Sequence, residues 1–147
     1  MKVVSNTSPL IGLAKIGRLD ILEQLFQRIM IPRTVYDEFF QAATPSEERH
    51  FQKVATGFVQ IVKVEQLCSF SRRLDRGESE VLTLALQEEA DFVILDDRKA
   101  FNEARELQLA AVSTRTVLTF AEERHLIPSY REIEDELRIN QFYPPKY

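Results

Sequence analysis

The stretch that decides the fold is Leu74–Lys99, which reads LDRGESEVLTLALQEEADFVILDDRK. Asp75 stands three residues before Glu78, which is the spacing of a capping box at the start of a helix. Apolar residues then recur at helical spacing, and the unbroken apolar run at residues 92–95 is typical of a strand buried on both faces. Two consecutive carboxylates follow at residues 96–97. This order places acids beyond the carboxyl end of a buried strand, where open parallel sheets bind their ligands.

The rest of the chain repeats this alternation of short apolar runs and helical patterns. Ser8 before Pro9 predicts a helix that begins at Ser8. Strands that alternate with helices predict an α/β fold with a central, mostly parallel sheet flanked by helices. We assign residues 1–140 to one domain and residues 141–147 to a C-terminal tail. Further strands are predicted near residues 3–5, 29–31, 59–64 and 110–112.

Composition bounds the class of protein. The chain has 147 residues, of which 44% are apolar, and this suits one domain with a substantial core. Cys68 is the only cysteine, so no internal disulfide can form, and we expect a reducing, cytoplasmic setting. No apolar run approaches the roughly 20 residues of a membrane span. The net charge of -4 argues against attachment to nucleic acid by overall charge alone.

Several common sites are excluded by spacing. Gly12 and Gly17 have the separation of a phosphate-binding P-loop, but Arg18-Leu19 replaces the required Lys-Ser/Thr pair. No glycine-rich dinucleotide motif follows a strand. His50 and His125 each lack a second His or Cys at ligand spacing. The remaining candidate chemistry is that of carboxylates.

Four acids are candidates for that chemistry: Glu38, Glu78, Asp96 and Asp97. Acids that lie beside strand ends or helix starts can converge at one edge of a parallel sheet, where they would repel one another. Mg²⁺ or Mn²⁺ removes this conflict, because both prefer oxygen ligands. Simpler interpretations stay open. Glu78 can close a capping box, the Asp pair can cap the next helix, and Glu38 can be a solvated helix residue.

Four stretches carry a resemblance to a known family. They are VSNTSPLI at residues 4–11, IPRTVYDE at 31–38, GESE at 77–80 and ILDDR at 94–98. In this order and at these separations they resemble the motifs of the PIN-domain family, most closely its DUF3368 branch, which is VapC-toxin-like. The resemblance covers nearly the whole chain and implies a PIN-like three-layer fold.

The resemblance also implies a site and an activity. It implies that Glu38, Glu78 and Asp97 are catalytic, that Asn6 and Asp96 join them in holding Mg²⁺ or Mn²⁺, and that the Thr114 hydroxyl supports the acids. The implied reaction is hydrolysis of single-stranded or structured RNA by metal-activated water. A small antitoxin protein and a second copy of the chain, forming a homodimer, are the implied protein partners. No membrane association is implied.

One position departs from the family pattern. The family usually has an Asp after the first strand, and this chain has Asn6 there. An amide oxygen can still bind a metal, but it brings no charge, so we expect weaker Mg²⁺ binding. Two alternatives therefore stay open: a metal-dependent ribonuclease, or a PIN scaffold that binds RNA or a protein partner with weak or lost catalysis.

Basic side chains near the acids are candidates for RNA contacts. Arg72, Arg73, Arg76 and Arg98 lie in loops or first turns that we expect to share a face with the carboxylates. We predict that some of them bind RNA phosphates, while dispersed, solvated charges remain the alternative. Phe70 can stack a base or fill a hydrophobic gap under its loop.

Overall fold

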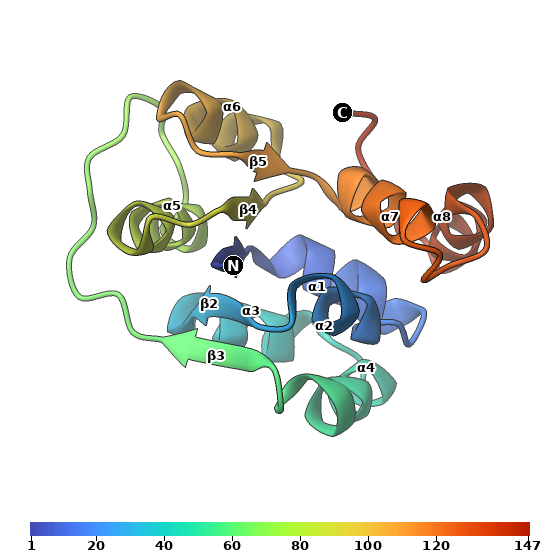
Figure 1. Cartoon of the computed structure of the whole chain (residues 1–147). Coiled ribbons are helices and arrows are strands. Elements are labelled where there is room, and N and C mark those ends of the chain that lie inside the picture. The colour runs from blue at the N-terminus through green and yellow to red at the C-terminus, as the bar shows by residue number, and fades with distance from the viewer.

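The centre of the molecule is a parallel sheet of five strands in the order β3-β2-β1-β4-β5 (Figure 1). The computed structural model describes residues 1–147. All four strand pairings are parallel, which confirms the predicted α/β class. The strands are β1 (Val3–Ser5), β2 (Ile29–Pro32), β3 (Val59–Val62), β4 (Phe92–Ile94) and β5 (Ala111–Val112).

Helices cover both faces of this sheet. Connections from β1 to β2 and from β2 to β3 step toward one edge, whereas those from β3 to β4 and from β4 to β5 step toward the other. Because parallel crossovers are right-handed, the two sets lie on opposite faces. The helices are α1 (Thr7–Lys15), α2 (Asp20–Phe26), α3 (Arg33–Ala42), α4 (Pro45–His50), the π-helical turn Phe51–Ala55, α5 (Arg76–Glu88), α6 (Arg98–Glu106), α7 (Thr114–Glu123) and α8 (Tyr130–Ile139).

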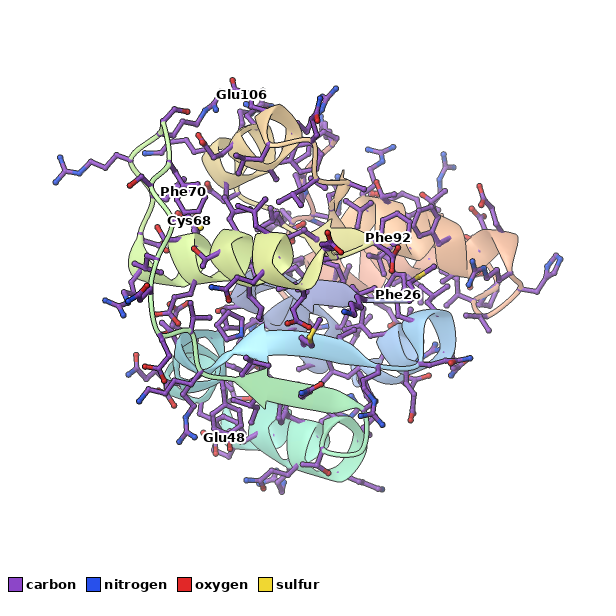
Figure 2. All side chains as sticks on the ribbon, turned by 60° about the vertical axis from the view of Figure 1, so that its left-hand side comes forward. Phe26, Glu48, Cys68, Phe70, Phe92 and Glu106 are labelled. Carbon is purple, nitrogen blue, oxygen red and sulfur yellow. The ribbon has the colours of Figure 1, made fainter.

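The apolar run after α5 lies in the middle of the core. Val93, Ile94 and Leu95 are fully buried, because β4 has β1 on one side, β5 on the other and α5 packed against it. This confirms the interpretation of an unbroken apolar run as an inner parallel strand. At one end of the sheet, the rings of Phe26 and Phe92 pack 6.1 Å apart (Figure 2). No helix combines the length and the apolar character that crossing a membrane requires.

Helix starts follow local hydrogen bonding. The capping box at α5 is confirmed: the Asp75 side chain accepts from the Glu78 backbone N–H at 2.8 Å, and the Glu78 carboxylate accepts from the Asp75 N–H at 3.1 Å. The prediction of Ser8 as a helix cap is wrong. Asn6 is the N-cap of α1, because its N–H makes the last sheet hydrogen bond, to the Ile94 carbonyl at 3.1 Å, and the helix begins directly after it.

The C-terminal tail folds back onto the domain. Phe142 packs against Gly12 of α1, where an added Cβ would lie only 2.7 Å from the aromatic ring. The tail then reaches the carboxyl edge of the sheet, where the Tyr147 ring packs on Phe101 with 4.7 Å between centroids. The Tyr147 hydroxyl donates to the backbone carbonyl of Asp96. The tail therefore packs on α1 through Phe142 and reaches the ends of the strands with its last residue, Tyr147.

Candidate functional site

The candidate site lies where the strand order reverses. β1 and β4 are neighbours, with Ser5 paired to Ile94, and the chain leaves them toward opposite faces of the sheet. Such a switch point is the usual ligand-binding position of an open parallel sheet. Asn6 follows β1 at this point, and residues 96–97 follow β4.

Glu78 and Asp97 form a carboxyl pair at this point. Asp97 is the N-cap of α6 and accepts from the Ala100 N–H at 3.0 Å, while Glu78 occupies the first turn of α5, beside Asp97. Burial and the negative charges of Asp75 and Asp97 raise the pKa of Glu78 to about 7, against the opposing effect of its hydrogen bond from the Asp75 backbone. Neither Glu78 nor Asp97 takes part in an ion pair with a basic side chain.

Glu38 reaches the same region from α3. Its Oε2 accepts from the Thr7 hydroxyl at 2.8 Å. Its Oε1 lies against Gly77 so closely that any Cβ at position 77 would overlap it. Gly77 therefore lets the Glu38 carboxylate approach the start of α5, next to Glu78.

The roles of Thr7 and Gly77 were not predicted from the sequence. A usable signal was present at Gly77, because glycine is a poor helix former and this one lies inside the first turn of a helix beside a candidate acid. Thr7 offered no comparable signal, since its partner is 31 residues away.

Asp96 turns away from that pair toward α7. Its two oxygens accept from the Thr114 N–H at 2.8 Å and the Thr114 hydroxyl at 2.7 Å, and the Ser8 hydroxyl also bonds to it. Burial raises the pKa of Asp96, while these hydrogen bonds oppose the rise. Asp96 and Thr114 thus form one unit that joins the end of β4 to the start of α7.

Asn6 is buried at the start of α1, with 8% of its surface exposed. Its side chain does not cap the helix that it precedes, so the amide is not committed to the usual hydrogen bond of that position. Its place at the switch point agrees with the predicted position of a metal ligand. The metal-binding role itself stays a prediction.

Among the predicted acids, the structure brings Glu78 and Asp97 together, holds Glu38 against the neighbouring Gly77, and ties Asp96 to Thr114. No group of three or more His, Cys, Asp or Glu side chains lies close enough to hold one metal ion. Two uncompensated carboxyl groups nevertheless match the donor chemistry that Mg²⁺ and Mn²⁺ prefer.

Arg72 is committed to acids on α6 rather than to the candidate site. Its guanidinium lies 3.1 Å from Glu103 and 2.8 Å from Glu106. Figure 2 shows the loop with Cys68 and Phe70 running beside α5, and Glu106 on α6. Phe70 is partly buried and packs on the core, which agrees with its interpretation as a hydrophobic plug.

The other predicted RNA-binding arginines differ in their surroundings. Arg76 pairs with the buried Glu80 at 2.7 Å, and the Arg98 guanidinium lies 5.3 Å from the centre of the Tyr147 ring. Arg73 belongs to none of the ion pairs. Contacts of these side chains with RNA stay predictions.

The fold and the site define an α/β domain with a five-stranded parallel sheet and carboxylates at its switch point. The model of the family described as PIN domain, DUF3368, matches residues 2–146. The chain therefore belongs to the PIN-domain family, which confirms the resemblance and places the chain in a nuclease fold. No curated protein matches the chain.

Two solved structures are similar to this chain, one of them with the same fold. A PilT N-terminus domain protein from the hyperthermophilic archaeon Sulfolobus solfataricus P2 superposes with a TM-score of 0.64 at 19% identity, covering 81% of this chain and 92% of that one. A domain of a functionally unknown protein from Methanocaldococcus jannaschii DSM 2661 has a TM-score of 0.49 at 15% identity, covering 76% and 89%. The first similarity supports the shared architecture.

Proposed function

We propose that this PIN domain is a metal-dependent endoribonuclease that hydrolyses RNA phosphodiesters. The observation that carries the proposal is the Glu78–Asp97 pair, in which two carboxyl groups share a switch point without a compensating cation. Holding like charges together costs free energy unless a cation binds between them, so the pair is suited to a divalent metal.

Glu78 and Asp97 would hold Mg²⁺ or Mn²⁺, with Glu38 and the amide oxygen of Asn6 completing the oxygen ligands. A divalent cation bound there would supply Lewis-acid chemistry, both activating a water and neutralising phosphate charge. The donor set fits this role because carboxylate and amide oxygens are preferred by both metals.

The chain's own residues hold and tune these acids. The Ala100 N–H orients Asp97, the Asp75 N–H orients Glu78, and the Thr7 hydroxyl orients Glu38. Burial and the neighbouring acids raise the pKa of Glu78 to about 7 in the metal-free chain. A cation held by Glu78 and Asp97 would favour the charged form of Glu78 and lower this pKa, so Glu78 would act as a ligand.

A second candidate function is a PIN scaffold that binds RNA or a protein partner without cutting it. Two observations favour it: the uncharged Asn6 stands where the family pattern has an acid, and no cluster of three acids is assembled. A toxin role, with a small antitoxin and a homodimer as its protein assemblies, is a finer version of the nuclease proposal and rests on the family resemblance.

Cleavage of a labelled single-stranded RNA with added Mn²⁺ tests the nuclease proposal. We expect Asp97→Asn to lower the cleavage rate at least about 100-fold, because it removes a charged ligand from the proposed metal site. Asp37→Asn is the matched control, since Asp37 is exposed and pairs only with Arg33. Absence of Mn²⁺-dependent cleavage in the parent protein would favour the non-cutting scaffold, and equal cleavage rates in the two variants would show that Asp97 is not part of the active site.

A further inference from the structure

A second feature near the strand ends is a basic pocket between α7, α8 and the tail, with a volume of about 280 Å³. Four of its seven lining residues are cationic and one is acidic, although the whole chain carries a net charge of -4. The lining residues are Arg115, Tyr130, Arg131, Glu134, Arg138, Pro144 and Lys146.

Most of the positive charge in the basic pocket is uncompensated. Glu134, its one acid, pairs with Arg138 at 3.3 Å and accepts a hydrogen bond from the Tyr130 hydroxyl. Neither Arg131 nor Lys146 takes part in an ion pair, and both are exposed. An unpaired group of cations in a concave surface attracts an anionic ligand.

The Arg115 guanidinium is held in place by an aromatic ring. It lies 5.2 Å from the centre of the Tyr130 ring, a distance at which a cation is attracted to the ring face. A guanidinium held in this way loses less freedom when it binds a phosphate through its fork of N–H donors.

The basic pocket is connected to the candidate active site at two points. Arg115 directly follows Thr114, whose N–H and hydroxyl both donate to Asp96. Lys146 directly precedes Tyr147, whose hydroxyl donates to the Asp96 carbonyl. Two of the four cations are therefore one residue away from groups that touch Asp96, next to the proposed catalytic Asp97.

We propose that the basic pocket binds backbone phosphates of the RNA substrate beside the scissile phosphodiester. This inference rests on the proposed function and names the part of the chain that would position its substrate. An RNA strand carries phosphates at regular intervals, so a strand with its scissile bond at the carboxylates has further phosphates that cationic side chains can bind. An acidic protein segment would explain the pocket alone and not its connection to Asp96.

The test compares RNA binding by two double variants of the full chain. Arg131→Gln/Lys146→Gln removes two of the three pocket cations that take part in no ion pair and leaves the third, Arg115, in place. Arg49→Gln/Lys53→Gln removes the same residue types from an exposed surface on α4 and the π-helical turn. Fluorescence anisotropy with a labelled single-stranded RNA, in EDTA so that the RNA stays intact, gives Kd over a range of salt concentrations.

We expect the pocket variant to bind about tenfold more weakly at 0.1 M salt and to lose about 1.4 from the slope of log K against log salt, as for two phosphate contacts. The control variant is expected to match the parent protein. Circular dichroism melting checks that both variants are folded. A pocket variant that binds RNA as well as the control does would overturn the proposal.

A second ligand separates this proposal from its main competitor. If an oligoglutamate peptide binds in a pocket-dependent way while RNA does not, the proposal is overturned in favour of an acidic protein partner. Cleavage with Mn²⁺ is measured separately. RNA binding that depends on the pocket, without cleavage, would support the role of the basic pocket and contradict the nuclease proposal. RNA cleavage together with binding that does not depend on the pocket would support the nuclease proposal and overturn the role of the basic pocket.

Discussion

Two acids, Glu103 within α6 and Glu78 in the first turn of α5, have opposite electrostatic surroundings. Glu103 on α6 is only 2% exposed and accepts hydrogen bonds from Ser71 and Arg72. Burial alone would raise the pKa of Glu103, but these bonds outweigh burial and hold it below its ordinary value. Glu78, in contrast, has a pKa raised to about 7 beside other acids. Glu103 therefore has a complete set of partners, whereas Glu78 lacks a cation.

The same contrast separates the basic side chains. Arg72 is neutralised by Glu103 and Glu106 on one side of the molecule, while Arg131 and Lys146 face a pocket with no acid partner of their own. Charged groups whose partners lie within the chain are explained by the fold. Those without partners are the candidates for binding a metal or RNA.

The largest effect in this comparison is expected when Glu103, the acid with a complete set of partners, is changed. Glu103→Gln replaces a buried anion by an amide whose NH₂ group would face other donors, so we expect the free energy of unfolding to fall by about 2 kcal/mol. Urea denaturation measures it, and RNA cleavage by the folded variant should stay within about threefold of the parent. Glu106→Gln, which removes the exposed partner of the same arginine, is the control and should change stability little. If both variants lose the same amount of free energy of unfolding, Glu103 is no more stabilised by its partners than the exposed Glu106.

A smaller effect is expected from a glycine beside the unpartnered acid. Gly77→Ala forces the Glu38 carboxylate to move, because the added Cβ would overlap Oε1. We expect RNA cleavage to fall about tenfold through this misplacement, with no loss of stability because alanine favours helix. Gly57→Ala has open space around the new Cβ and should cleave like the parent. If both variants cleave equally well, Glu38 is not part of the site.

The smallest effect is a dependence of stability on pH. The folded-state pKa of Glu78 is about 7 and its ordinary value is 4.5, so the folded chain binds this proton more tightly than the unfolded chain. The contribution of Glu78 to stability therefore falls as pH rises from about 4.5 to about 7 and stays lowered above that range. Glutamine keeps the capping box and removes the charge. Glu78→Gln should thus be more stable than the parent at pH 8 and similar to it near pH 4.

Thermal melts in EDTA at the two pH values measure this difference. Glu132→Gln is the matched control, because Glu132 follows the Ser129 cap of α8 at the same helix position and is exposed. The control is expected to differ from the parent by the same amount at both pH values. If the stability difference between Glu78→Gln and the parent is also the same at both pH values, the folded chain does not raise the pKa of Glu78.

Patterns within single segments were sufficient to predict much of the fold. The capping box at Asp75 and Glu78 and the inner parallel strand at residues 92–95 both follow from such patterns and are confirmed. These features depend on neighbours in the chain or on the period of apolar residues. The cap at Ser8 was predicted wrongly, because the end of the sheet ladder at Asn6 decides where α1 begins.

The partners of charged groups depended on the three-dimensional structure. Arg72 meets Glu103 across 31 residues of chain, and Tyr147 meets the Asp96 carbonyl across 51. No local sequence pattern predicts these contacts. The two partners of each contact come together only when the helices and the tail have packed. Local sequence was therefore enough to predict where the acids stand along the chain, but only packing determines which of them are neutralised. The free energy of a charge depends on everything around it in space.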